Sequence, residues 1–175
     1  MKDAFSALVN QRQSCRKFND KPLSVETVKD IAKQAMLAPS ACNSQPWKMY
    51  LVTSPEKVEL TALALGSKSH NKFLTEAKAF IVFADRIATL KPGVKYDRNH
   101  FVKYDIGELL AYITLTAKSM GIESCIIGMV KQDLITSAVG LKDGEQCNVA
   151  VALGYSDIPL RDKVRKNFED VVKIL

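Results

Sequence analysis

A continuous apolar run, Ala-Phe-Ile-Val-Phe-Ala at positions 79–84, constrains the fold of this 175-residue chain more than any other segment. A strand with one face in water alternates apolar and polar residues, whereas a strand that is covered on both faces is apolar throughout. The run is also rich in residues that favour strands. We therefore expect residues 79–84 to form a central strand in a sheet that is covered on both faces.

Helical and strand patterns alternate along the rest of the chain. Ser24 is a candidate N-cap for a helix whose apolar residues recur every three or four positions, and Pro39 limits that helix. Gly121 is expected to end the longest helix. The predicted helices span residues 3–11, 25–37, 101–120 and 132–139, and a further helix opens at Pro55. The predicted strands span residues 48–53, 123–127 and 147–154, and residues 90–97 are predicted to form a loop.

The composition indicates one folded domain, residues 1–175, with 47% hydrophobic and 25% charged residues. Four cysteines without a CxxC pair and only two histidines argue against a zinc site and against a disulfide framework. No apolar run is long enough to span a membrane, and the first residues lack the apolar core of a signal peptide. We expect a cytoplasmic protein without metal and without a membrane partner.

The net charge of +6 raises the possibility of a nucleic-acid-binding domain. The basic residues are interleaved with acidic ones, and no block of Lys and Arg or stacking motif accompanies them. The charge pattern is more typical of a solvated surface that contains a small cationic pocket. We therefore expect no nucleic-acid partner.

Residues 12–16, the clamp segment, have the sequence Arg-Gln-Ser-Cys-Arg. If this segment is extended, Arg12, Ser14 and Arg16 share one face, and Gln13 and Cys15 share the other. Two guanidinium groups and a hydroxyl can bind a phosphate group, and each charged hydrogen bond that is shielded from water can contribute roughly 1.5 to 3 kcal/mol. The alternative is an exposed basic turn without a ligand.

Residues 38–47, the polar loop, have the sequence Ala-Pro-Ser-Ala-Cys-Asn-Ser-Gln-Pro-Trp and lie between a predicted helix and a predicted strand. The loop supplies several amide and hydroxyl groups over a short distance, as the edge of a flavin ring would require. The alternative is a turn that ends the helix and places Trp47 in the core. Cys42 is expected to be a small packed thiol rather than a redox group.

Taken together, these segments resemble the FMN-dependent nitroreductase family. Residues 12–18 are similar to its RRSxRxF element, and the polar loop is similar to its APSxxNxQPW element. The similarity continues in residues 105–107 and 121–128, which resemble the long core helix and the strand that follows it. Residues 153–155 and 163–165 resemble the LGYP and KxR ending, although Ser156 stands where proline is usual.

The resemblance implies an α+β fold, a three-layer α/β/α sandwich with a mixed, mainly antiparallel sheet, and a homodimer with FMN in two clefts at the interface. The clamp segment would hold the phosphate and ribityl chain together with basic residues of the tail, residues 160–175, which is also expected to dock on the partner subunit. The polar loop would contact the ring from the partner subunit. The implied cofactor-binding residues are Arg12, Gln13, Ser14, Arg16, Pro39, Ser40, Ala41, Asn43, Gln45, Asn71, Lys72, Ile127, Gly128, Lys163 and Arg165.

The implied activity is an FMN-dependent oxidoreductase that passes electrons from NADH or NADPH to nitroaromatics, quinones or similar small acceptors. No residue need act as a covalent catalyst, because the chemistry takes place on FMN. Residues 90–99 are all that separate the central strand from the long helix, which implies a compact member with a short lid. The alternative is a protein that binds or sequesters flavin without turnover. No GxGxxG motif supports a Rossmann-type nicotinamide site.

Overall fold

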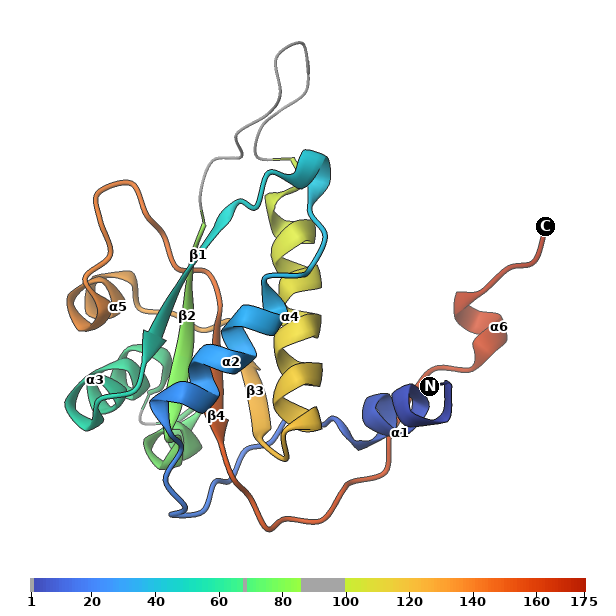
Figure 1. The fold of residues 1–175 in the computed structure, drawn as a ribbon, viewed down its shortest axis with the longest axis horizontal. Coiled ribbons are helices and arrows are strands. Elements are labelled where there is room, and N and C mark those ends of the chain that lie inside the picture. The colour runs from blue at the N-terminus through green and yellow to red at the C-terminus, as the bar shows by residue number, and fades with distance from the viewer. Residues whose placement is uncertain (1, 68, 86–99) are drawn as a thin grey trace.

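The computed structural model describes residues 2–67, 69–85 and 100–175 (Figure 1). In these residues the α-helices are α1 (Lys2–Gln11), α2 (Val25–Ala35), α3 (Pro55–Leu65), α4 (Val102–Ser119), α5 (Gln132–Val139) and α6 (Phe168–Val171). The strands are β1 (Trp47–Val52), β2 (Ala79–Asp85), β3 (Glu123–Ile127) and β4 (Ala150–Gly154). Two 3-10 helices, η1 (Ala41–Asn43) and η2 (Lys72–Glu76), lie in the connections.

The four strands form one sheet in the order β1-β2-β4-β3, and each neighbouring pair is antiparallel. The register places Ile81 opposite both Leu51 of β1 and Val151 of β4. The clamp segment adds a single parallel bridge between Ser14 and Ser124 of β3. The four described strands are therefore antiparallel throughout, and the only parallel pairing among the described residues is this isolated bridge, so the antiparallel character is confirmed and a mixed sheet is not.

Strand β2 occupies the interior of the sheet, and its side chains alternate between two buried cores. Phe80 and Val82 pack in the core on the side of α3 and α5, whereas Ile81 and Phe83 pack on the side of α2 and α4. All four side chains have no exposed surface. Figure 1 shows the same arrangement, with helices on both sides of the sheet. The expected central strand and the three-layer α+β architecture are confirmed.

Local signals in the sequence account for the helix boundaries. The Ser24 hydroxyl accepts a hydrogen bond from the Thr27 N–H at 3.1 Å, which caps α2 as predicted. Pro55 is the first residue of α3, and Gly121 follows α4 with a φ of +73°. The predicted limits of α5 and β3 are confirmed. The predicted loop at 90–97 and the short connection at 90–99 lie outside the described residues.

The last strand begins three residues later than the sequence predicts. The side chain of Gln132 accepts a hydrogen bond from the Cys147 N–H at 3.3 Å and donates one to the Cys147 carbonyl. This amide replaces a neighbouring strand at Cys147, so the regular ladder starts only at Ala150. A side chain from a separate helix thus sets the boundary, which a period-two pattern could not indicate.

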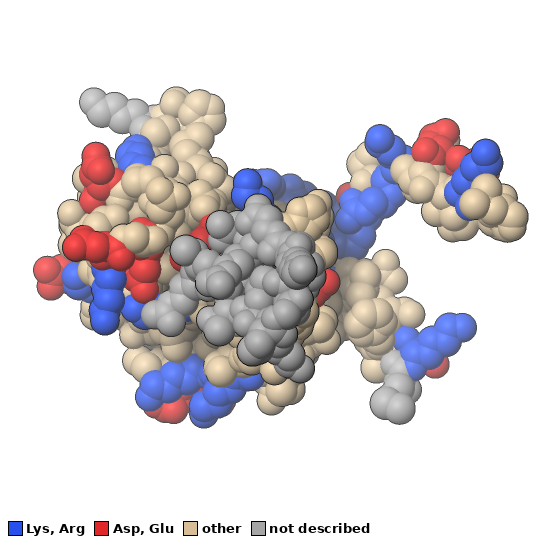
Figure 2. All heavy atoms as spheres, turned by 90° about the horizontal axis from the view of Figure 1, so that it is seen from above, with Lys and Arg blue, Asp and Glu red and all other residues tan. Residues whose placement is uncertain are grey.

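Both chain ends project from the sandwich as separate arms. Helix α1 contains no buried residue, and the tail leaves the body beside it (Figure 1). Figure 2 shows Lys and Arg side chains gathered where the tail leaves the body. Farther along, Phe168 is 60% exposed and Ile174 is 86% exposed. Such apolar arms on a folded body usually pack against another surface.

A buried contact joins two of the sequence elements on which the resemblance rests. The ring of Phe18 lies against Gly154, so that a Cβ atom added at Gly154 would come within 2.8 Å of Phe18 Cδ1. Phe18 is only 5% exposed and has little room to move. Both residues are thus required for packing.

We therefore expect Gly154→Ala to lower the free energy of unfolding by about 1 to 3 kcal/mol, which urea denaturation would measure. The double variant Phe18→Leu/Gly154→Ala should lose less stability than the sum of the two single variants, because the smaller side chain gives the new methyl group room. Simple additivity would contradict this contact.

Glu145 links the loop before β4 to the edge strand β1. Its carboxylate accepts hydrogen bonds from the Tyr50 hydroxyl, from the Lys142 N–H at 3.0 Å and from Lys48 Nζ at 3.1 Å. The Tyr50 bond, followed by that of Lys142, lowers the pKa of Glu145 from 4.5 to about 2. A carboxylate with a lowered pKa stabilises the fold above its unfolded pKa, and this contribution is lost as the pH falls through the folded pKa.

For Glu145→Gln we expect a loss of stability that is largest above about pH 5 and shrinks as the pH falls toward 2. Urea denaturation of both proteins at a series of pH values would measure the difference. Tyr50→Phe should reproduce part of the effect, since it removes the strongest cause of the pKa shift. A difference that stays constant between pH 2 and pH 7 would rule this explanation out.

Candidate functional site

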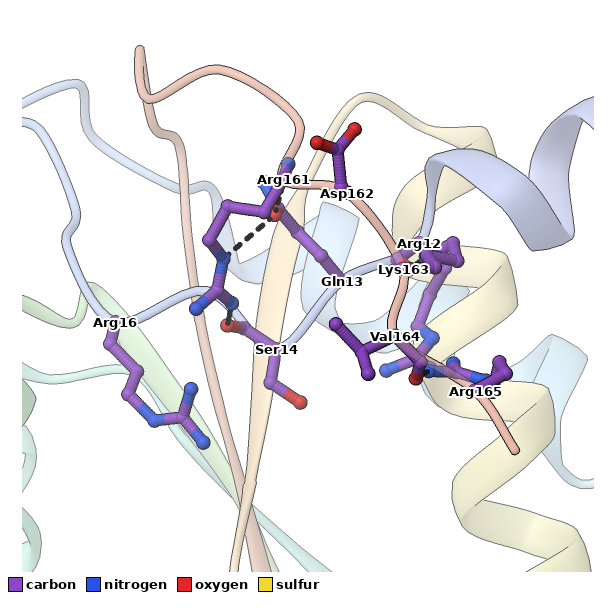
Figure 3. Close-up of a pocket in the computed structure, with 9 residues that line it drawn as sticks. All are labelled: Arg12, Gln13, Ser14, Arg16, Arg161, Asp162, Lys163, Val164 and Arg165. Carbon is purple, nitrogen blue, oxygen red and sulfur yellow. Dashed lines mark hydrogen bonds between the residues drawn. The ribbon is translucent and has the colours of Figure 1, made fainter. Parts of the chain in front are cut away.

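A cavity of about 300 Å³ lies between the clamp segment and the tail (Figure 3). It is lined mainly by basic side chains from these two segments, which are far apart in the sequence. The lining residues are Arg12, Gln13, Ser14, Arg16, Arg161, Asp162, Lys163, Val164 and Arg165. The structure thus brings together the clamp residues and the two basic tail residues that the resemblance implies.

The clamp segment is extended and is fixed beside β3. The Cys15 N–H donates a hydrogen bond to the Ser124 carbonyl at 2.9 Å, next to the bridge between Ser14 and Ser124. Cys15 is fully buried and Gln13 is 8% exposed, while Ser14 is partly exposed. The predicted alternation is therefore present, and it leaves the arginine side of the segment toward the cavity.

The first part of the tail is tied to the clamp segment by four hydrogen bonds. Both the backbone N–H and Nε of Arg161 donate to Gln13 Oε1 at 3.3 Å, and Arg161 Nη2 donates to the Ser14 carbonyl at 2.7 Å. Lys163 Nζ donates to the Arg12 carbonyl at 2.5 Å. Gln13, which the sequence places among the cofactor ligands, uses its amide oxygen to hold the tail. Sequence reasoning missed Arg161, although it lies two positions before Lys163 in the same basic segment.

The positive charges around the cavity have few counter-charges. In the described part of the chain, no carboxylate forms an ion pair with Arg12, Arg16, Arg161 or Arg165. Burial lowers the pKa of Lys163 below its usual value of 10.5, and the nearby charges of Arg12, Arg165 and Arg161 lower it further. An anion of charge near −2 would relieve this repulsion and accept hydrogen bonds from several of these groups.

The polar loop contains a run of left-handed backbone conformations. Cys42, Asn43 and Gln45 have φ values of 53°, 54° and 46°. The Ser40 hydroxyl accepts a hydrogen bond from the Gln45 N–H at 3.0 Å, which closes the loop. Pro39, Asn43 and Gln45 are exposed, and Ser40 and Ala41 are partly exposed. The loop thus presents polar groups to its surroundings.

Two residues of the polar loop bear on the alternatives left open by the sequence. Trp47 is 8% exposed and packs in the core between the sheet and α2, so the loop does end in a core tryptophan. Cys42 is exposed, and the prediction of a packed thiol is wrong. Cys42 has a left-handed backbone conformation, with a φ of 53° and a ψ of 22°, which the sequence pattern does not reveal.

Within one chain the polar loop and the clamp segment lie at opposite ends of α4 (Figure 1). The Ala41 N–H donates to Asp105 in the first turn of α4, whereas the clamp segment pairs with Ser124, just beyond the last turn. A helix of 18 residues is about 27 Å long at 1.5 Å per residue. The structure therefore does not bring these two predicted parts of the site together.

The remaining predicted residues are Ile127 and Gly128, at the end of β3, and Asn71 and Lys72, which lie elsewhere. The bridge between Ser14 and Ser124 is isolated, and Ile127 and Gly128 lie farther along, where β3 ends at Ile127. Ile127 is 3% exposed, and a Cβ atom added at Gly128 would meet no atom within 4 Å. Packing within the chain therefore does not explain why residue 128 is a glycine.

Asn71 and Lys72 lie elsewhere. They line a separate hollow that also contains Lys131, and the Asn71 side chain donates to the Leu65 carbonyl at 3.3 Å. The structure does not bring these two residues into the cavity of the clamp segment. In the described residues no group of His, Cys, Asp and Glu has the arrangement of a metal site. None of the described helices has the length and apolar character needed to cross a membrane.

Comparisons with known proteins agree with the sequence resemblance. The sequence model that describes the nitroreductase family matches residues 9–69 and 59–155 of this chain. A nitrobenzene nitroreductase of Ectopseudomonas oleovorans is 41% identical over 58 residues, which cover 33% of this chain and 26% of the relative. A protein of Archaeoglobus fulgidus, assigned as an NADH dehydrogenase or NAD(P)H nitroreductase, is 29% identical over 152 residues, which cover 85% of this chain and 83% of the relative.

The fold also matches solved structures. A crystal structure from Staphylococcus epidermidis, of a protein assigned as an NAD(P)H:FMN oxidoreductase, superimposes with a TM-score of 0.82 at 23% identity. The superposition covers 98% of this chain and 95% of the other. The likeness therefore extends over the whole sandwich, including the segments that form the cavity.

Proposed function

Because the chain belongs to the nitroreductase family, we propose that it is an FMN-dependent oxidoreductase that passes electrons from NADH or NADPH to nitroaromatics, quinones or similar acceptors. The observation that carries the proposal is the cavity between the clamp segment and the tail, where several cationic groups converge without ion-pair partners in the described residues. A phosphate group is the part of FMN that such a cluster would bind.

The phosphate end of FMN fits the donors on this chain. Arg12 and Arg16 offer forked guanidinium donors, and Ser14 offers a hydroxyl group. Lys163 and Arg165 would complete the anion site from the tail. Burial and then the neighbouring cations lower the pKa of Lys163, and a bound phosphate would raise that pKa by offsetting the repulsion between the cations.

The ring end of FMN requires a second copy of the chain. The polar loop lies at the other end of α4 from its own clamp segment, so only the loop of a partner could reach the same cavity. The exposed apolar residues of the tail support such a homodimer, because they need a surface to cover them. The open space at Gly128 leaves room for a ring close to the backbone.

When bound, FMN supplies the redox chemistry, by taking a hydride from NAD(P)H and delivering electrons to an acceptor. The task of the chain is to bind and orient. The clamp segment and the tail fix the phosphate end, and the polar loop offers amide and hydroxyl groups to the ring edge. The names of the relatives, which include a nitrobenzene nitroreductase and an NAD(P)H:FMN oxidoreductase, support this class of donor and acceptor.

The first test is a titration of the purified protein with FMN, followed by oxidation of NADH and NADPH with p-benzoquinone or nitrobenzene as acceptor. The proposal predicts quenching of flavin fluorescence, a higher melting temperature, and oxidation of at least one nicotinamide that depends on the acceptor. Flavin binding without such oxidation would favour the flavin-sequestering alternative. No flavin binding together with salt-sensitive retention on DNA would favour a nucleic-acid-binding domain.

A further inference from the structure

Asp105 is a buried acidic residue in the first turn of α4, at the end where the polar loop lies. The residue is 4% exposed, and its Oδ1 accepts a hydrogen bond from the Ala41 N–H at 3.0 Å. In the described part of the chain its other oxygen, Oδ2, is buried and has no hydrogen-bond partner. A half-satisfied buried carboxylate is costly, so packing alone does not explain an aspartate at this position.

The polar loop closes on itself but needs a tie to the body to hold its position. The Asn43 N–H donates to the Ser40 carbonyl at 2.9 Å, and the Ser44 N–H donates to the Ala41 carbonyl at 3.0 Å. These bonds shape the turn without fixing it to α4. The bond between Ala41 and Asp105 joins the start of η1 to the long helix.

The conformation that this bond anchors is an uncommon one. Left-handed backbone at residues other than glycine persists only where the surroundings determine it, and Cys42 and Asn43 adopt it in succession. Asp105 fixes the residue immediately before this pair. The carboxylate therefore acts on the direction in which the loop presents its amide and hydroxyl groups.

We propose that Asp105 is a positioning residue that holds the polar loop in the shape required to contact the flavin ring. This inference rests on the proposed function, since it takes the loop as the wall of a flavin site. Asp105 acts through Ala41 and does not touch the phosphate end. Loss of the bond should therefore weaken binding of the ring and leave the contribution of the phosphate unchanged.

Three variants isolate the bond. Asp105→Leu removes the acceptor and keeps the branching at Cγ, and Asp105→Asn keeps an oxygen acceptor at nearly the same volume. Ala41→Pro removes the donor of the same hydrogen bond. Proline suits this position because Ala41 is the first residue of η1 and the preceding Ser40 is extended, with φ −152° and ψ 153°.

Asp105→Leu and Ala41→Pro should each weaken the binding of both FMN and riboflavin about tenfold. The double variant should lose no more than either single variant, and Asp105→Asn should stay within about threefold of the natural protein.

A selective loss of FMN affinity, or unchanged affinity for both flavins, would overturn the proposal.

A second measurement uses the fluorescence of Trp47, the single tryptophan of the chain, and needs no flavin. The backbone N–H of Trp47 donates to the Gln45 carbonyl at 2.8 Å, which ties Trp47 to the polar loop. Asp105→Leu should increase quenching of Trp47 fluorescence by acrylamide, whereas Asp105→Asn should not. If the natural protein binds neither flavin, the proposed function fails, and equal Trp47 quenching in all variants would overturn the positioning role itself.

Discussion

Replacing both Arg12 and Arg16 with alanine is expected to weaken FMN binding by about 10² to 10⁴-fold and to leave riboflavin affinity within about threefold. Each arginine would contribute charged hydrogen bonds worth roughly 1.5 to 3 kcal/mol to the phosphate, and riboflavin has no phosphate to lose. The two side chains line the cavity and have no ion-pair partner in the described residues. The ratio of FMN to riboflavin affinity, measured by flavin fluorescence, isolates the phosphate end of the site.

The matched control removes the same charge at a distance from the cavity. Lys29 and Lys33 are exposed on α2, where they pair with Glu26 and Asp30. The variant Lys29→Ala/Lys33→Ala should keep FMN affinity within about threefold at physiological salt, where distant surface charges are screened. If this control weakens FMN as much as the arginine variant does, general electrostatic attraction explains the binding and the clamp assignment is wrong.

Deleting residues 167–175 is expected to raise the dissociation constant of the homodimer by at least about 10³-fold and to abolish FMN binding at micromolar protein. The deletion keeps Lys163 and Arg165 but removes exposed apolar side chains such as Phe168, Ile174 and Leu175. Burying each of these on a partner would contribute roughly 1.5 to 3 kcal/mol. Analytical ultracentrifugation would show a shift from twice the chain mass to the mass of one chain.

The control for this deletion changes the charges of the same segment and keeps its apolar residues. Glu169→Gln/Lys173→Gln should remain dimeric and bind FMN normally, since exposed charges contribute little. A truncated chain that stays dimeric would show that the end of the tail does not hold the partner. A truncated monomer that still binds FMN with full affinity would contradict the need for a second copy.

The sequence predicts the layers of the fold because burial leaves a local pattern. The apolar run at 79–84 marks β2, whose side chains alternate between two cores. Ser24, Pro55 and Gly121 mark helix boundaries through capping and backbone conformations that act within a few residues. Such signals are readable without knowledge of the rest of the chain.

Contacts between distant segments explain what the sequence could not predict. The start of β4 depends on the side chain of Gln132, and the role of Gln13 depends on the path of a tail nearly 150 residues away. Asp105 meets Ala41 only because α2 and α4 lie on the same face of the sheet. A single sequence carries no period or motif for these pairings.

In the candidate site, too, local features were predicted from the sequence, whereas some contacts between distant segments were not. The alternation of the clamp segment is a local property, and the structure shows it. The convergence of the tail on the clamp segment is shown by the cavity that they line together, although Arg161 was missed. The assignment of the polar loop to the partner's cavity stays a prediction, supported by its position at the far end of α4.

The most direct test of this composite site pairs two inactive variants in one dimer. One chain carries Arg12→Ala/Arg16→Ala, and the other carries Ala41→Trp to block the ring wall; differently tagged chains allow the mixed dimer to be purified and its FMN content measured. If each cavity combines the clamp segment of one chain with the polar loop of the other, the mixed dimer has one intact site and binds one FMN per two chains tightly, while each parent has no intact site. A mixed dimer that binds no FMN would contradict the account.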